Sequence, residues 1–531
     1  MTHACSRFQA LARHWRRPWC AGRALAWLPL CLFALSWLGC RDYFVLRRQL
    51  TQPAASSALD HGSPYLKAHL RDGGVLVFKQ WVVNDSLRQV MGRAARYNAR
   101  RDLLGRGQQA QPLDSVVLLE TNTLEVYSGT AVLRVMAGMY LVGDMLCAAA
   151  PKLCFGSCPT FYSLDGPEPV LQAEGFSASI SPCLEASDLD ALCRPHGLPA
   201  ELVLEVRNEA LETHAIRWAD LVLVPRRPGE EIFKDTAGVF WAGSELEAPL
   251  SGVELDAGTR STLAGKDGQE WTEPADSLDL GARRHLELDF ARPSDGRLGL
   301  AVCGRQSLLT TFVFYQALAW MGTKAGDCLA ALERGDLRWT GTLNHLAEIR
   351  VNVWDGRTWR EAGTLSEVGP LALDEHLVLL PDLPASPDGR VRVRLDFTRG
   401  AWRLDRVALA SVAPAAPATR LSPDTVTRGG APAPAALSAL LDPQRLLTTE
   451  PGDAYRLHYR VPAELADAAA FLDNRGWYLE WMREAWLREE NPRQLARLLR
   501  RPGRALRELA PAYKAVEAEM DDIFWNSRYA R

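Results

Sequence analysis

The sequence predicts an α+β protein that is β-rich and multidomain. With 531 residues, the chain is long enough for roughly three or four domains of ordinary size. Hydrophobic residues make up 47% and charged residues 24%, which is typical of globular proteins and excludes a mainly disordered, collagenous or multi-span membrane chain. Short segments in which apolar and polar residues alternate recur between turn signals, and this pattern is typical of β-strands.

The first forty residues have the pattern of an export signal. Five arginines precede an apolar run over residues 24–39, and Cys40 follows. The run is shorter than the ~20 residues that a bilayer span needs, but it suits the hydrophobic region of a signal peptide. Gly39 and Cys40 resemble the lipobox of bacterial lipoproteins, with Trp37 where that motif usually has Leu. The resemblance implies that Cys40 is lipidated and becomes the mature N-terminus.

Two other interpretations of residues 1–40 stay open. In an uncleaved signal anchor, the apolar run stays in the membrane and Cys40 is an ordinary thiol. In the other, the protein is cytosolic or its start is misassigned. The excess of arginine before the apolar run favours export of the remaining chain in the first two cases. We therefore expect a membrane-anchored protein of the bacterial cell envelope that faces the periplasm or the cell surface.

The segment after Cys40 is predicted to hold a tether and a small β domain. Residues 41–60 are expected to form a short strand and then a tether. Residues 61–122 are expected to form a small β-meander that carries several arginines on one side, with strands at 74–83 and 113–120. Residues 87–104 are ambiguous, because their charges suit a helix whereas their glycines suit hairpins.

Residues 126–335 are predicted to form a mixed α/β central domain. Helices are expected at 130–145 and 308–332, where apolar residues are dense. Strands are expected at 201–207, 285–290 and 298–303.

Residues 336–462 are predicted to form a β-sandwich, because strands and Asp-Gly turns alternate at short spacing. Its expected strands are residues 349–354, 376–380, 391–397, 403–410 and 455–461. Within it, the Ala/Pro-rich insertion 413–436 has the composition of a linker. Residues 463–531 are predicted to be a helical C-terminal region that begins with the aromatic segment 476–486 and is divided by Pro492 and Pro502.

A local motif stands at Cys154-Phe-Gly-Ser-Cys158-Pro-Thr-Phe-Tyr162. Together with the Asp-Gly turn at 165–166, residues 154–175 resemble the Cys-Phe-Gly-x-Cys-Pro-x-Tyr hairpin of an uncharacterised family of bacterial secreted and lipoprotein domains. Phe161 and Tyr162 stand where that family has one aromatic residue. The resemblance implies a β-hairpin in an exported protein and carries no activity with it.

The cysteines are candidates for disulfides or for reactive thiols. Cys154, Cys158, Cys183 and Cys193 lie within fifty residues of one another, and an oxidising periplasm would favour pairing, for example of Cys183 with Cys193. Two thiolates with three residues between them, as at Cys154 and Cys158, can also bind a soft metal or cycle as a disulfide. No ligand spacing supports a metal site, so the structural interpretation is favoured.

Three further clusters have simple structural explanations. The acidic residues Glu174, Glu185, Asp188 and Asp190 suit acid–base chemistry or Ca²⁺ binding, but Ser187 and the aspartates after it equally suit a helix start. Arginines at near-helical spacing over 493–507 are expected to be a solvated helix face rather than a membrane-facing stripe. Trp477, Trp481 and Trp486 suit a sugar-binding cleft, but are expected to be core.

These observations favour a membrane-anchored structural or binding scaffold of the cell envelope over an enzyme. The chain lacks the sequence motifs of serine hydrolases, zinc proteases and nucleotide-binding folds, so no catalytic residue, metal or cofactor is predicted. An envelope hydrolase or carbohydrate-binding enzyme is one alternative, and a Cys-based metal or thiol-redox protein is the other. The expected partners are the membrane and an envelope protein or glycan. A net charge of −3 gives no attraction to nucleic acid.

Overall fold

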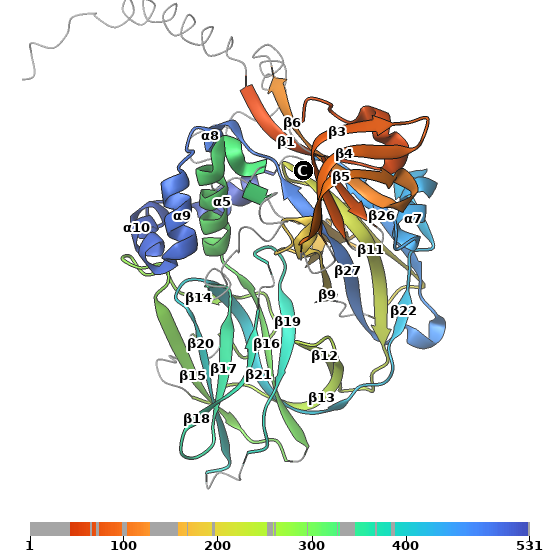
Figure 1. The fold of residues 1–531 in the computed structure, drawn as a ribbon. Coiled ribbons are helices and arrows are strands. Elements are labelled where there is room, and N and C mark those ends of the chain that lie inside the picture. Colours follow the sequence, from red (N-terminus) through yellow and green to blue (C-terminus); the bar gives the residue numbers. More distant parts are fainter. Residues whose placement is uncertain are drawn as a thin grey trace, which may run out of the picture. The chain divides into compact units, whose positions relative to one another are not determined.

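The computed structural model describes residues 43–63, 66–70, 74–97, 103–127, 158–166, 168–193, 197–251, 259, 262–294, 296–326, 328–329, 346–366, 369–383 and 388–528. Two compact units divide the chain, residues 1–45 with 124–142 and residues 46–123 with 143–531. Only the ends of two strands of the first unit lie within the described residues. The second unit holds several sheets and a few helices, which confirms the β-rich α+β class (Figure 1).

The N-terminal sheet has six strands in the order β1-β6-β2-β3-β4-β5. They are β1 (Tyr43–Thr51), β2 (Leu66–Leu70), β3 (Val75–Asn84), β4 (Gln89–Tyr97), β5 (Leu103–Pro112) and β6 (Val116–Tyr127), with short 3-10 helices η1 (Pro53–Ala58) and η2 (Leu113–Ser115). Leu66, Ala68 and Leu70 of β2 join the apolar core on one face, so Lys67 and His69 lie on the other. The ambiguous segment 87–104 forms β4 and the start of β5.

Two sheets form what we call the first sheet pair, because one hydrophobic core takes residues from both. One sheet has the order β24-β23-β26-β10-β7-β8 and the other β22-β11-β27-β9, with β25 beside β11. The strands are β7 (Thr160–Ser163), β8 (Val170–Glu174), β9 (Ala186–Ala191), β10 (Glu201–Arg207), β11 (Glu212–Val224), β22 (Thr419–Leu421), β23 (Thr425–Arg428), β24 (Ala431–Pro432), β25 (Leu447–Thr449), β26 (Ala454–Arg460) and β27 (Ala469–Glu480).

The second sheet pair likewise shares one core, which is the largest in the described residues. Its sheets have the orders β13-β12-β19-β16-β21-β14 and β15-β20-β17-β18. The strands are β12 (Glu231–Asp235), β13 (Phe240–Glu247), β14 (Trp271–Thr272), β15 (Arg283–Ala291), β16 (Arg297–Gln306), β17 (Ile349–Trp354), β18 (Trp359–Leu365), β19 (Asp374–Leu379), β20 (Arg390–Thr398) and β21 (Trp402–Pro414). An additional pairing of β13 with β21 closes five of the strands into a ring.

The second sheet pair is inserted into the first. The chain leaves the first pair after β11, builds β12 to β21, and returns to the first pair at β22. The yellow-green strand β11 therefore lies beside the blue strand β27 in Figure 1, although more than two hundred residues separate them. Residues far apart in the sequence can meet where the two pairs adjoin.

The helices are α5 (Leu309–Met321), α7 (Pro434–Leu441), α8 (Glu484–Leu487), α9 (Pro492–Arg500), α10 (Pro502–Lys514) and α11 (Met520–Asn526), and short 3-10 turns are η4 (Pro182–Leu184), η5 (Gly322–Lys324) and η7 (Ala463–Leu465). Pro492 and Pro502 begin helices, as predicted, because a first-turn residue needs no N–H donor. Trp486, Leu498 and Phe524 join the core of the second sheet pair. Among the described residues, no helix has the length and hydrophobicity of a membrane span.

Three of the predictions for the C-terminal half are wrong. Residues 476–480 belong to strand β27 and not to a helix, because a strand buried on both faces has the same dense apolar composition as a buried helix. The segment 413–436 is not a linker, since it forms β22, β23 and β24. The strand near 455–461 pairs with β10 and β23 of the first sheet pair, rather than with the strands of 349–410.

Candidate functional site

The motif with two cysteines forms a hairpin where it is described. Strand β7 pairs antiparallel with β8, and Gln172 is the extra residue at a bulge between them. Cys158 lies buried just before β7, and its thiol donates to Glu174 Oε1 at 3.4 Å. Cys40 and Cys154 lie outside the described residues.

The other candidate cysteines are not paired with each other. Cys183 lies in η4, where its sulfur is 3.7 Å from Ser181 Oγ, and Cys193 is exposed after β9. The backbone N–H of Cys193 donates to Gln172 Oε1 at 2.9 Å. Cys158, Cys183 and Cys193 are thus thiols in the described structure, and the suggested disulfide between Cys183 and Cys193 is not formed.

Glu174 connects the hairpin to the second sheet pair. Its Oε2 accepts a hydrogen bond from the backbone N–H of Leu371 at 2.6 Å. Gly369 makes this approach possible, because its φ is +83° and a Cβ there would lie 2.5 Å from Glu174 Oε2. Only glycine satisfies both conditions without strain.

Strand β9 brings the other predicted acidic residues to the same region. Ser187 does not begin a helix, so the helix-start explanation of Asp188 and Asp190 is wrong. The two aspartates are two positions apart on a strand and therefore share a face. Asn474 of β27 donates to Asp190 Oδ2 at 3.3 Å. Glu185 lies apart from them, in an ion pair with Arg217 and Arg475.

A buried lysine and a third aspartate from the inserted sheet pair complete the group. Lys234 Nζ of β12 lies 2.6 Å from Asp374 Oδ2 of β19, and both side chains are 3% exposed. His376 Nε2 lies 2.7 Å from the same oxygen. The backbone N–H of Ala191 in β9 donates to Asp374 Oδ1 at 3.3 Å. We call Asp188, Asp190, Lys234, Asp374 and His376 the aspartate cluster.

Two aspartates of this cluster have pKa values that are shifted in opposite directions. Burial raises the pKa of Asp190 well above its ordinary value, and the nearby charges of Asp188 and Asp374 raise it further. Burial alone would also raise the pKa of Asp374, but Lys234 and His376 outweigh it and hold that pKa well below the ordinary value. The two pKa shifts have opposite directions, so Asp190 keeps its proton to a higher pH than Asp374 does.

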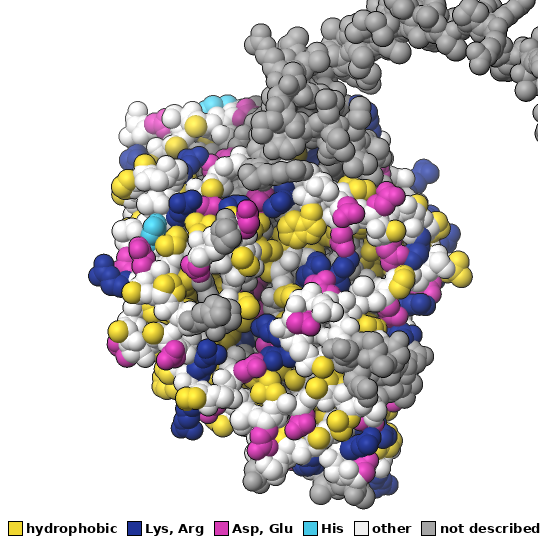
Figure 2. All heavy atoms as spheres, turned by 180° about the vertical axis from the view of Figure 1, so that it is seen from behind, with side chains coloured by type: hydrophobic (Ala, Val, Ile, Leu, Met, Phe, Trp, Pro, Cys, Tyr) yellow, Lys and Arg dark blue, Asp and Glu magenta, His cyan; other side chains and the backbone are white. Residues whose placement is uncertain are grey.

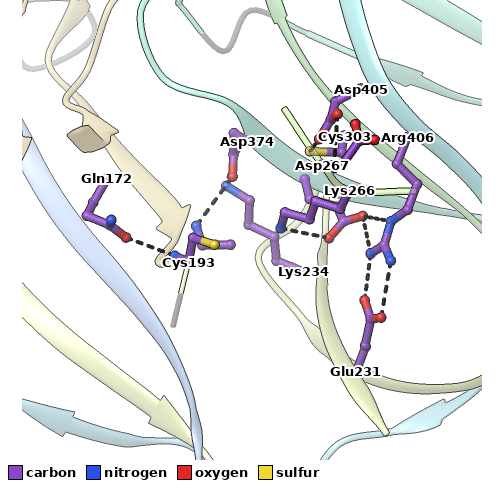
Figure 3. A network of polar contacts seen from close by, with 12 residues as sticks. Gln172, Cys193, Glu231, Lys234, Lys266, Asp267, Cys303, Asp374, Asp405 and Arg406 are labelled. Atoms are coloured by element: carbon purple, nitrogen blue, oxygen red, sulfur yellow. Dashed lines mark hydrogen bonds and ion pairs between the residues drawn. The ribbon is translucent and has the colours of Figure 1, made fainter. Parts of the chain in front are cut away.

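A second network continues along β19 and β21 (Figure 3). Glu375, next to Asp374, accepts from Lys266 Nζ at 3.3 Å and from Arg406 Nε at 3.0 Å. Arg406 also donates to Glu231 Oε1 at 3.1 Å. Burial raises the pKa of the Cys303 thiol in this network well above its usual range, so this cysteine is not an activated nucleophile.

A third buried group lies at the end of β11 and β27, and no sequence pattern pointed to it. Glu212 and Glu480 are opposite each other in the two strands, and Arg483 donates to Glu480 Oε1 at 2.6 Å. Burial raises the pKa of Glu212 to about 7, and burial together with the nearby Glu212 raises the pKa of Glu480 well above its ordinary value. Burial lowers the pKa of His214 to about 3, and its ring is neutral.

These groups allow acid–base chemistry but offer no site for a metal ion. A carboxylic acid beside a carboxylate is the pair that general acid–base catalysis uses. In the aspartate cluster, the Asp374 carboxylate is already paired with the Lys234 ammonium group, which occupies the place that a cation would take. Over the described ranges, no group of three or more His, Cys, Asp or Glu side chains could hold a metal ion.

The aromatic and arginine candidates have structural roles. Trp477, Trp481 and Trp486 are 2%, 8% and 0% exposed, which makes them core residues as expected. The arginines of 493–507 include Arg497 and Arg504, which both pair with Glu508. These contacts fit a solvated helix face.

Comparisons with known proteins identify no relative. No family model and no curated protein matches the chain. Among solved structures, the arabinofuranosyltransferase AftD from Mycobacteria shares 11% identity over 82% of this chain and 31% of its own, with a TM-score of 0.14. The secreted serine protease VesC from Vibrio cholerae shares 9% identity over 69% of this chain and 98% of its own, with a TM-score of 0.13. Neither similarity is close enough to indicate a fold or an activity.

Proposed function

We propose that this protein is a membrane-anchored scaffold of the bacterial cell envelope, held by a lipid on Cys40 or by an uncleaved signal anchor. In this proposal the first forty residues export the chain, and the remainder presents a rigid body to the periplasm or the cell surface. The small β-meander follows the anchor, the two sheet pairs are β-sandwiches, and the C-terminal helices pack on the second of them. An envelope protein or glycan is the proposed partner.

One observation carries the proposal of a rigid body. Polar contacts of buried side chains join the two sheet pairs to each other and the first pair to the C-terminal helical region. Asp374 of the inserted pair binds Lys234 and also accepts from Ala191 of the first pair. Glu209 of the first pair lies 3.3 Å from Arg528, which follows the C-terminal helices. Breaking a buried ion pair typically costs about 3–5 kcal/mol, so such contacts hold the parts in one arrangement.

The N-terminal sheet has a buried ion pair within it and an aromatic contact with the first sheet pair. Lys67 Nζ lies 3.2 Å from Glu120 Oε1, and both side chains are fully buried. His69 Nε2 lies 3.1 Å from Glu120 Oε2, and its ring is 6.3 Å from the ring of Trp477 in the first sheet pair. The ion pair stabilises the N-terminal sheet itself, and the ring contact of His69 with Trp477 joins that sheet to the first sheet pair.

Intact-mass analysis of membrane-extracted protein tests the anchoring. We expect a chain that begins at Cys40 and carries acyl mass, or an unprocessed chain that stays with the membrane fraction. A Cys40→Ser variant should lose the acyl mass in the first case and remain unchanged in the second. Protein that is soluble inside the cell, with its first residue unprocessed, would refute the proposal.

The aspartate cluster favours a hydrolase as the second candidate function. The opposite pKa shifts of Asp190, the proposed proton donor, and Asp374, the proposed ionised partner, correspond to the two roles that a glycoside hydrolase needs. The test is release of soluble fragments from purified peptidoglycan sacculi by the wild-type protein, by Asp190→Asn and, as a control, by Asp396→Asn. If the wild type and Asp396→Asn release fragments and Asp190→Asn does not, hydrolysis is supported. If the wild type releases no fragments, the scaffold function is retained and the hydrolase is rejected.

A further inference from the structure

The charge of this protein is unevenly distributed along the chain. Residues 41–127, which hold the N-terminal sheet, contain 12 Lys and Arg against 8 Asp and Glu, a formal charge of +4. Residues 128–531 contain 44 Lys and Arg against 56 Asp and Glu, a formal charge of −12. The basic part begins directly after Cys40, so it is the part that the proposed anchor keeps nearest the membrane.

Within this part, three neighbouring strands carry cations and no anions. Strands β3, β4 and β5 contain no Asp or Glu. Lys79, Arg93 and Arg106 on these strands are exposed and, within the described structure, form no ion pair. By contrast, Arg88 in the turn before β4 pairs with Asp114. On the face of the molecule drawn in Figure 2, acidic and basic side chains are interspersed.

The strand register places these cations together. Arg93 pairs with Gln80 on one side and Gln108 on the other, and Arg106 pairs with Ala95, two residues from Arg93. Residues opposite each other in neighbouring strands share a face, so Arg93 and Arg106 project from the same face. Lys79 is the extra residue at the bulge next to Gln80. We call Lys79, Arg93 and Arg106 the basic strip.

An exposed apolar side chain accompanies the basic strip. Val82 lies two residues after Gln80 on β3, which puts it on the same face as Arg93, and it is 61% exposed. Exposed apolar residues beside cations are typical of surfaces that rest in the headgroup region of a membrane. Nearer β2 the same face is buried, since Val77 lies opposite Lys67 and Ala95, so the strip occupies the exposed end of this face.

We propose that the basic strip binds the anionic headgroups of phospholipids in the membrane that anchors the protein. This proposal rests on the proposed membrane anchoring. Each Lys or Arg near an anionic bilayer strengthens binding about fivefold, and three act together on a sheet that is already tethered. The negative charge of residues 128–531 is repelled by the same surface, so the electrostatic attraction orients the N-terminal sheet toward the lipid.

The test compares arginine labelling on two kinds of vesicle. The full chain is reconstituted into vesicles of phosphatidylcholine alone or with one third phosphatidylglycerol, and phenylglyoxal modification is quantified by mass spectrometry. We expect Arg93 and Arg106 to be labelled at least about threefold more slowly on the anionic vesicles. The exposed arginines Arg357, Arg460 and Arg493, which form no ion pair within the described residues, serve as internal controls and should react equally on both. Salt at about 0.5 M should remove the difference.

A single substitution tests the strip without removing the labelled residues. Lys79→Gln should weaken the protection of Arg93 and Arg106 on anionic vesicles, whereas Lys324→Gln, at an exposed lysine of the helical region, should not. Equal labelling of Arg93 and Arg106 on both vesicles overturns the proposal. Equal protection by soluble dextran sulfate on neutral vesicles also overturns it, because the strip would then bind polyanions without a membrane.

Flotation separates this proposal from the proposed function. If the protein stays on neutral vesicles but Arg93 and Arg106 are not protected selectively on anionic ones, the anchor is kept and the lipid contact of the strip is overturned. If the protein instead leaves neutral vesicles but stays on anionic ones, with weaker retention in Lys79→Gln, the anchor is overturned and the basic strip is supported. Loss from both kinds of vesicle overturns both.

Discussion

Lys234 and Asp374 form a buried ion pair between β12 and β19, with 2.6 Å between Nζ and Oδ2. The same aspartate accepts a hydrogen bond from Ala191 of β9, which belongs to the other sheet pair. Asp374 therefore takes part both in an ion pair within the inserted sheet pair and in a hydrogen bond to the first sheet pair. Burial alone would lower the pKa of Lys234, but the charges of Asp374, Asp190 and Asp188 outweigh it and raise that pKa.

Lys234→Met should destabilise the protein by about 3–5 kcal/mol, because it leaves the buried carboxylate of Asp374 with less compensation. Urea unfolding monitored by tryptophan fluorescence measures the change. Lys324→Met is the matched control, since Lys324 is 61% exposed and lies 3.8 Å from Glu490. A loss of stability as small as that of the control would show that the ion pair is not buried in solution.

Stability should fall as pH rises through about 7, because of Glu212. Its pKa is raised to about 7 by burial, above the ordinary value of a glutamate in the unfolded chain. The folded state therefore binds the extra proton, and the stabilisation is present at pH 4.5 and lost above pH 7. Glu212→Gln should flatten this dependence by roughly 3 kcal/mol between pH 5 and 8. An unchanged slope of unfolding free energy against pH would contradict the buried acid pair.

The cysteines should differ in reactivity according to burial. In the native protein, iodoacetamide should modify Cys193 fastest and Cys158 only after unfolding, because Cys193 is exposed and Cys158 is 2% exposed. Mass spectrometry of the digested protein gives the order. A disulfide between Cys183 and Cys193 in membrane-extracted protein would contradict the structure and support the sequence-based suggestion.

Gly369→Ala should destabilise the contact between the two sheet pairs. The new Cβ would lie 2.5 Å from Glu174 Oε2, in addition to the strain of a positive φ, which costs roughly 1–2 kcal/mol. Gly389→Ala is the control, because Gly389 also has a positive φ of 67° but nothing within 4 Å of a Cβ. We expect the larger loss at Gly369, and equal losses would mean that Glu174 does not approach this loop.

Strands with strict alternation were predictable from the sequence. Residues 391–397 form most of β20, and residues 201–207 coincide with β10, because one face of each strand is buried and the other is not. Strand β27 was not predictable, since residues such as Trp477, Tyr478 and Leu479 are buried on both faces and leave no period.

The candidate site was only partly predictable. Asp188 and Asp190 stood out as acidic residues, but Lys234 and Asp374 carry no local signal and lie 140 residues apart. The parallel pairing of β12 with β19 brings them together, and a hydrogen bond from Ala191 joins β19 to β9. A pattern within a short segment cannot specify such a contact, because the contact depends on pairing between distant strands.

The sequence alone determined the features that depend on local composition: the apolar run before Cys40, the β-rich class, and the strands whose hydrophobic period is two. Local patterns suffice for these because each involves residues that are neighbours in the chain. The tertiary structure alone decided that one sheet pair is inserted in the other and that Asp190, Lys234 and Asp374 form one cluster. The physical reason is that burial and charge pairing depend on which distant strands share hydrogen bonds and a core, and no segment carries that information by itself.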